Sequence, residues 1–246
     1  MGGPGMATSE AITELKLPAD VNAHALADAN TLATTLANDV AERLRAAVAA
    51  KGEACVVLSG GRSPVPFLEK LSGQSLDWAK VTVSLADERW VPVEHADSNA
   101  GLLARHLLKG PAAKARFVGL YQQAESLDAA ALKADQALAA LPVIDVLVLG
   151  MGDDGHTASL FPASPELKAG LDLASSRRCL PMLAPGVPHQ RLSMTRALLA
   201  SAAFIALSVQ GQGKLATLRA ALGGNDLTEM PIRAFLHDPL DIYWCP

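Results

Sequence analysis

The chain of 246 residues has few cysteines, few aromatic side chains and no block of basic charge. Its three cysteines, Cys55, Cys179 and Cys245, stand far apart and form no CxxC pair, which argues against a disulfide framework or a zinc cluster. Aromatic residues make up 4% of the chain and the net charge is −4, so neither a base-stacking surface nor a face for a polyanion is indicated. We therefore expect no nucleic-acid partner.

Long apolar runs are also missing. No stretch reaches the roughly 20 residues of a membrane span, and the chain does not open on a basic-then-apolar signal peptide. Apolar residues still make up 50% of the composition, which is enough for a sizeable core. We expect a cytoplasmic protein without a membrane partner, a disordered N-terminus over residues 1–9 and a single α/β domain over residues 10–246.

Apolar runs alternate with amphipathic segments along the chain. The runs predict strands at 54–58, 81–86, 116–121, 144–150, 177–183, 204–209 and 242–245. The amphipathic segments predict helices at 22–50, 97–109, 124–140 and 212–222. This order indicates a Rossmann-like, three-layer α/β fold, with a mostly parallel sheet and helices on both faces. Ligands bind such sheets at the carboxyl ends of the strands, where the polar, glycine-rich segments of this chain stand.

The first of these segments is SGGRSP at 59–64, directly after a predicted strand. Its two glycines permit a tight turn with exposed backbone N–H groups, and Pro64 suits the first turn of a helix. A helix N-terminus with free N–H groups can bind an anion. The segment is therefore either a phosphate-binding loop or an ordinary strand-to-helix turn.

The second segment places three consecutive charges, Asp87, Glu88 and Arg89, at the mouth of a buried strand. An acid beside a cation can bind sugar hydroxyls and phosphate. The alternative is a solvated loop with one salt bridge. The sequence DSN at 97–99 indicates a helix N-cap shortly afterwards.

The third segment is GMGDDGHTASLFP at 150–162. Its glycines match G-x-G-x-x-G after a strand, the pattern of a dinucleotide site. The match falls late in the chain, and two nearby prolines stop the helix that such a site needs. His156 lies in a Gly/Asp loop at a strand end, a position that favours a general base over a structural histidine.

Two later segments carry candidate cations. Arg191 lies in PHQRLSMT at 188–195, and Lys214 follows a strand and opens a helix. Each can bind a phosphate or be a surface charge.

These segments together resemble one family. SGGRSP, DERWVP, DSNAGLL, GMGDDGHTASLFP, PHQRLSMT and GQGKLATL are similar to the 6-phosphogluconolactonase subfamily of the glucosamine/galactosamine-6-phosphate isomerase family, over most of residues 54–245. The resemblance implies the fold of glucosamine-6-phosphate deaminase and ribose-5-phosphate isomerase. The deaminases continue a similar glycine–histidine motif with Asn-Glu-Pro, whereas this chain continues with SLFP at 159–162, as the lactonases do.

The resemblance also implies an activity: hydrolysis of 6-phospho-D-glucono-1,5-lactone to 6-phosphogluconate, the second step of the oxidative pentose phosphate pathway, without a metal or organic cofactor. The implied substrate-binding residues are Ser59, Gly60, Gly61, Arg62, Ser63, Arg89, Gly152, Arg191 and Lys214.

A mechanism follows from the chemistry of a lactone. Its carbonyl is electrophilic enough to react without a covalent nucleophile, so His156 can take a proton from water as the water attacks C1. Either Asp87 or Asp154 orients the imidazole or binds sugar hydroxyls. No G-x-S-x-G elbow is present.

Other hypotheses remain at this point. A sugar-phosphate isomerase or deaminase would use the same fold, and a non-catalytic sugar-phosphate sensor would keep the phosphate loop without a base. We expect no metal site, because His156, His189 and the Asp153-Asp154 pair fit no standard zinc spacing. For the oligomeric state we expect a monomer or a weak homodimer.

Overall fold

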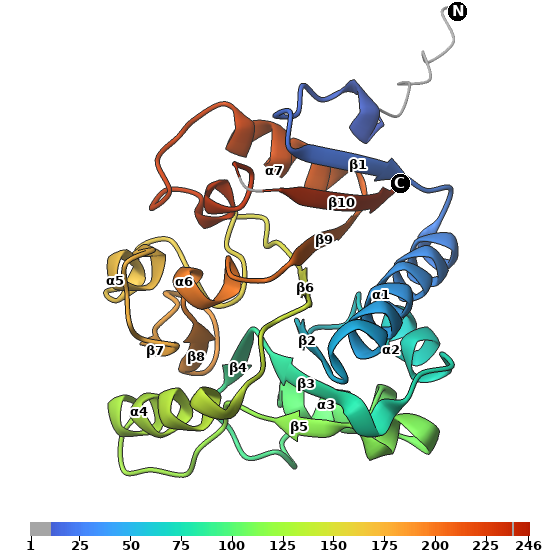
Figure 1. Cartoon of the computed structure of the whole chain (residues 1–246). Coiled ribbons are helices and arrows are strands. Elements are labelled where there is room, and N and C mark those ends of the chain that lie inside the picture. The colour runs from blue at the N-terminus through green and yellow to red at the C-terminus, as the bar shows by residue number, and fades with distance from the viewer. Residues whose placement is uncertain (1–10, 238) are drawn as a thin grey trace, which may run out of the picture.

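The computed structural model describes residues 11–237 and 239–246 (Figure 1). The expected disorder of residues 1–9 lies outside the described residues. The strands are β1 (Val21–Ala25), β2 (Ala54–Leu58), β3 (Val81–Leu85), β4 (Asp87–Arg89), β5 (Arg116–Val118), β6 (Val146–Leu149), β7 (Cys179–Met182), β8 (Arg191–Met194), β9 (Phe204–Gln210) and β10 (Leu240–Cys245). The α-helices are α1 (Ala29–Lys51), α2 (Val65–Ser72), α3 (Asn99–His106), α4 (Leu127–Ala137), α5 (Leu167–Leu171), α6 (Arg196–Leu199) and α7 (Gln212–Leu222).

The main sheet has seven strands in the order β1-β10-β9-β6-β2-β3-β5, and every neighbouring pair is parallel. All residues of β2, β3 and β6 are buried, as expected for central strands that are covered on both faces. Helix α1 packs against β2, β6 and β10, while α7 packs against β9 (Figure 1). The predicted α/β fold with a mostly parallel sheet is confirmed.

The strand order reverses direction next to β2. From β2 the chain continues to β3 and β5 on one side, and it then returns to add β6, β9 and β10 on the other side. The loops that follow β2 and β6 therefore flank a topological switch point. In open parallel sheets this is where ligand-binding crevices form.

A second, three-stranded sheet stands beside the main one, in the order β4-β8-β7 with antiparallel pairing (Figure 1). The sequence predicted neither β4 nor β8, because each is short and becomes a strand only by pairing across a long stretch of chain. The predicted strand at 177–183 exists as β7, but it belongs to this antiparallel sheet.

The predicted helix at 22–50 was wrong in its first part. Val21–Ala25 is β1, an edge strand parallel to β10, and the helix begins at Ala29. Asp28 caps it by accepting the backbone N–H of Thr31 at 2.7 Å. The alanines of β1 extend the helical pattern of α1, so only pairing with the distant β10 separates the two.

The three cysteines are buried and free. Among the described residues, no helix has both the length and the apolar character that crossing a bilayer requires.

Candidate active site

A cleft opens at the carboxyl ends of β2 and β6, beside the first strand of the small sheet. The residues that line it are Ser59, Gly60, Gly61, Ser63, Asp87, Arg89, Asn99, Gly150, Met151, Gly152, His156, Ala158 and Arg191. The cleft thus collects the segments after β2 and β6 at the switch point. It adds side chains from β4, β8 and the start of α3.

The loop after β2 has little room for side chains. Gly61 has a left-handed φ of +99°, and a Cβ at Gly60 would lie 2.0 Å from Oδ1 of Asn99. The Ser59 hydroxyl donates to the carbonyl of Val148 at 3.0 Å and so ties the end of β2 to β6. Glycine is therefore needed at position 60 for close approach and at 61 for backbone conformation.

His156 is held by its own loop. Its Nδ1 lies 2.5 Å from Oδ1 of Asp154, and the same carboxylate oxygen accepts the backbone N–H of His156 at 3.0 Å. The imidazole packs on Phe161 with ring centroids 4.3 Å apart. Because Asp154 engages Nδ1, the Nε2 atom is left as the nitrogen that can accept a proton.

Gly152 makes space for this histidine. A Cβ at Gly152 would lie 2.1 Å from Cε1 of His156, and the Gly152 N–H donates to the His156 carbonyl at 2.9 Å. The loop then turns at Gly155, whose φ is +80° and whose carbonyl accepts the N–H of Ile232. No helix follows the glycines, in line with the sequence argument against a dinucleotide site.

Asp87 is buried and does not bond to His156. Its Oδ2 accepts a hydrogen bond from the hydroxyl of Ser159 at 2.6 Å. The backbone N–H of Ser159 in turn donates to the hydroxyl oxygen of Ser193. Of the two carboxylates that the sequence left open, Asp154 is therefore the one that bonds to the imidazole.

Two arginines occupy paired positions on neighbouring strands of the small sheet. Arg89 in β4 is the direct partner of Arg191 in β8, a juxtaposition of like charges that is unfavourable on its own. The Nε atoms of both are buried and have no hydrogen-bond partner among the described residues. Burial lowers the pKa of the Arg191 guanidinium, and the negative charge of Asp87 opposes this lowering. Together these features describe a site that an anion would complete.

Glu88, which lies between Asp87 and Arg89, is fully buried and holds the start of α3 in place. Its carboxylate accepts the backbone N–H groups of Arg89, Asn99 and Ala100 at 2.7–2.8 Å, and so caps the start of α3. Burial raises the pKa of Glu88 to about 7 although these hydrogen bonds oppose the rise. The Asn99 side chain donates to the Asp87 carbonyl, which fixes it in the cleft wall.

The structure brings most of the predicted site residues to the cleft, but three lie outside its lining. Asp154 stands behind His156, Arg62 is exposed, and Lys214 pairs with Asp153 at 2.8 Å. Sequence reasoning missed Asn99, Gly150, Met151 and Ala158 as lining residues. All four stand in segments that the sequence analysis singled out: Gly150, Met151 and Ala158 belong to the motif at 150–162, and Asn99 follows the capping Ser98 and was interpreted as a helix start alone.

Known proteins are similar to this chain over nearly its whole length. A family model described as glucosamine-6-phosphate isomerases/6-phosphogluconolactonase matches residues 27–244. The chain is 86% identical over 246 residues to a 6-phosphogluconolactonase of Pseudomonas putida, which covers 100% of both chains. It is 62% identical over 237 residues to one of Pseudomonas aeruginosa, over 96% of this chain and 100% of the relative. The crystal structure of a 6-phosphogluconolactonase from Shewanella baltica covers 94% of this chain and 100% of its own, at 36% identity and a TM-score of 0.90.

Proposed function

The chain belongs to the glucosamine-6-phosphate isomerase/6-phosphogluconolactonase family, and we propose that it hydrolyses 6-phosphogluconolactone to 6-phosphogluconate with a water that His156 activates. Identity to lactonases of two Pseudomonas species over nearly the whole chain supports this activity, which is a step of the pentose phosphate pathway. The same identity places the chain with the lactone hydrolases of the family rather than with its isomerases.

One observation carries the mechanism: the His156–Asp154 pair faces a cleft that also holds Arg89 and Arg191. A base and two cations in one cleft match a substrate that carries both a reactive carbonyl and a phosphate. Binding the phosphate away from C1 positions the lactone ring for attack.

The proposed reaction begins with His156 Nε2 taking a proton from water as the water oxygen bonds to C1. Asp154 accepts the Nδ1–H and stabilises the imidazolium that forms. Collapse of the tetrahedral intermediate breaks the bond between C1 and the ring oxygen, and the imidazolium returns its proton to that oxygen. The products are a free hydroxyl and a carboxylic acid, which then ionises.

Phosphate recognition is assigned in this proposal to Arg89, Arg191 and the loop at 59–63. The buried, unpartnered Nε atoms of the arginines support their part in it. Arg62 and Lys214 would contribute only after their side chains move toward the cleft, because neither lines it. Asp87, held by Ser159, is placed to accept a sugar hydroxyl.

Acid release from freshly made lactone tests the proposal. Glucose-6-phosphate dehydrogenase generates the phosphorylated lactone in situ, and spontaneous opening is subtracted. We expect rapid hydrolysis of this lactone and a much lower kcat/KM on glucono-1,5-lactone, which lacks the phosphate. Equal kcat/KM on the two would contradict phosphate binding, and no acceleration over the background would contradict the activity.

The proposal also covers the domain organisation, the cellular location and the oligomeric state. We propose a single domain over residues 10–246, which is supported by one continuous hydrophobic core among the described residues. We propose a cytoplasmic location, with which three buried free thiols agree. We propose a monomer or a weak homodimer, to be checked by sedimentation.

A further inference from the structure

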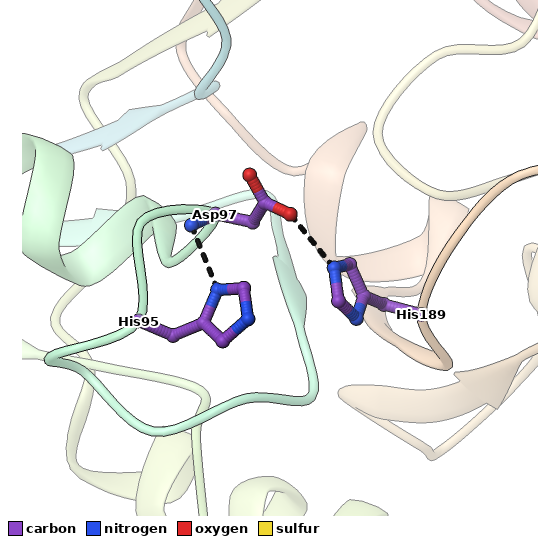
Figure 2. Close-up of side chains that lie close together, drawn as sticks. All are labelled: His95, Asp97 and His189. Atoms are coloured by element: carbon purple, nitrogen blue, oxygen red, sulfur yellow. Dashed lines mark hydrogen bonds and ion pairs between the residues drawn. The ribbon is translucent and has the colours of Figure 1, made fainter.

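Two histidines and one aspartate meet at the rim of the cleft. His95 and Asp97 lie in the loop between β4 and α3, and His189 lies just before β8 (Figure 2). His189 Nε2 is 2.8 Å from Oδ2 of Asp97, and the Asp97 N–H donates to Nδ1 of His95 at 3.0 Å. One ligand atom from each of the three residues lies within 4.8 Å of the others.

This donor set has a recognisable chemistry. Two imidazoles with one carboxylate suit a borderline divalent ion such as Zn²⁺, whereas Mg²⁺ and Ca²⁺ prefer oxygen ligands alone. Zinc bound by three protein ligands completes its tetrahedron with water. The side chains are exposed or half-buried, so an ion can reach them from solvent.

The backbone of His189 supports a built arrangement. Its φ is +70°, a left-handed conformation that is uncommon for a residue other than glycine. Such conformations persist where the surrounding structure requires them. Here the turn directs the imidazole of His189 to Asp97 across the rim, with its ring edge-on to that of His95 at a centroid distance of 5.2 Å.

We propose that His95, Asp97 and His189 bind one Zn²⁺ ion that braces the rim of the cleft. The ion would join the loop after β4 to the segment before β8, and these segments adjoin the two cleft arginines, Arg89 at the end of β4 and Arg191 at the start of β8. The Asp97 carbonyl already accepts Nη1 of Arg89 at 2.8 Å, and His189 stands two positions before Arg191. None of the three ligands lines the cleft, so the ion has no step in the reaction.

Zinc must displace two existing interactions, and this lowers its affinity for the site. The lone pair of His95 Nδ1 now accepts the Asp97 N–H, and the His189–Asp97 contact holds a proton. An ion must replace both interactions. We therefore expect binding that weakens as the pH falls, because protons compete for the same ligands.

Calorimetric titration of tag-free protein with ZnCl₂ tests the site. We expect one ion per chain with a dissociation constant below ~100 µM. His189→Asn and His95→Ala should each weaken binding by at least ~10-fold. Asparagine suits the left-handed backbone at position 189, so this variant keeps the fold. His106→Ala is the matched control, since His106 also pairs with a carboxylate, Glu69 at 2.7 Å, but has no second imidazole beside it.

Amide hydrogen exchange supplies a second readout. Zinc should slow exchange across residues 183–190 in the wild-type chain and in His106→Ala, and leave it unchanged in His189→Asn. MgCl₂ should produce neither heat nor protection. Zinc binding of equal strength in wild type, His189→Asn and His95→Ala would overturn the proposal, as would the absence of binding up to ~100 µM.

Discussion

The His156 loop and the arginine pair of the cleft are built in different ways. In the His156 loop, Gly152, Asp154 and His156 bond to one another over a few residues of chain. In the arginine pair, Arg89 and Arg191 meet only because β4 pairs with β8, which brings distant segments together. The His156 loop is thus a local feature and the arginine pair a tertiary one.

This difference has a kinetic consequence under the proposed mechanism. The base acts on the water at C1, so its loss lowers kcat. The arginines hold a phosphate that does not react, so their loss raises KM and weakens discrimination between phosphorylated and plain lactone. Substitutions in the His156 loop and in the arginine pair should therefore change different kinetic constants.

The largest effect is expected at His156. His156→Ala or His156→Asn should lower kcat by at least ~10²-fold with little change in KM, because a positioned base typically contributes ~10²–10⁴-fold. The wild-type rate should also fall in acid, since a protonated imidazole cannot accept a proton from water. Initial rates of acid release, corrected for spontaneous opening, measure both.

A structural histidine would behave in the opposite way. The variant would lose stability while its folded fraction kept normal turnover, and circular dichroism of the assayed sample distinguishes the two cases. A folded His156→Ala enzyme with near-normal kcat would remove His156 from the mechanism and leave Asp87 as the next candidate base.

The next effect is expected at the arginines. Arg191→Ala or Arg89→Ala should raise KM for the phosphorylated lactone by about 10–100-fold, the value of a charge-assisted hydrogen bond, while kcat on the plain lactone stays the same. Arg178→Ala is the control, since Arg178 is exposed and pairs with Asp135 at 3.9 Å. Unchanged KM in both cleft variants would move phosphate binding elsewhere, with Arg62 and Lys214 the first residues to examine.

The contrast between the His156 loop and the arginine pair also explains what the sequence could predict. The strand at 54–58 matches β2 and the helix at 212–222 matches α7, because each has a clear periodicity and a stop signal. The His156 loop could be predicted for a similar reason, since all of its candidate residues lie in one glycine-rich segment. β1 was missed because its alanines extend the helical pattern of α1, and β10 alone defines it as a strand.

The arginine pair could be predicted only in part. Arg89 and Arg191 were candidates as single residues, but nothing in the sequence paired them, since β4 and β8 are too short to be recognised. The same holds for the cluster at the rim: His95 and Asp97 are neighbours in the chain, and only the fold adds His189. Spacing rules identify metal ligands within one segment and fail when ligands come from two.

A smaller effect is expected at Gly152, where a substitution changes the position of the His156 imidazole without replacing His156 itself. Gly152→Ala places a methyl group 2.1 Å from the present position of His156 Cε1, so the imidazole must shift. We expect kcat to fall by about 10-fold, since small misplacements of a catalytic group are costly. Gly213→Ala in α7 is the control, because a Cβ there meets nothing within 4 Å. Equal kcat in both variants would show that His156 tolerates displacement.

The smallest effect is expected at Glu88, and it concerns stability. Burial raises the pKa of Glu88 to about 7 from its ordinary value of 4.5, so between these values the folded chain binds a proton that the unfolded chain has released. The free energy of unfolding contributed by this group must then fall as the pH rises from about 5 to about 7.5, by about 1–3 kcal/mol. Glu88→Gln has no proton to bind and should lose this slope, while Glu125→Gln, at an exposed glutamate, should keep it. Urea unfolding at the two pH values measures the slope.

The other carboxyl groups with shifted pKa values, such as Asp135 and Asp153, have lowered pKa values and titrate below this pH range. They therefore do not affect the comparison between wild type and Glu88→Gln. Parallel slopes in wild type and Glu88→Gln would mean that the three backbone N–H donors outweigh burial and keep Glu88 ionised throughout.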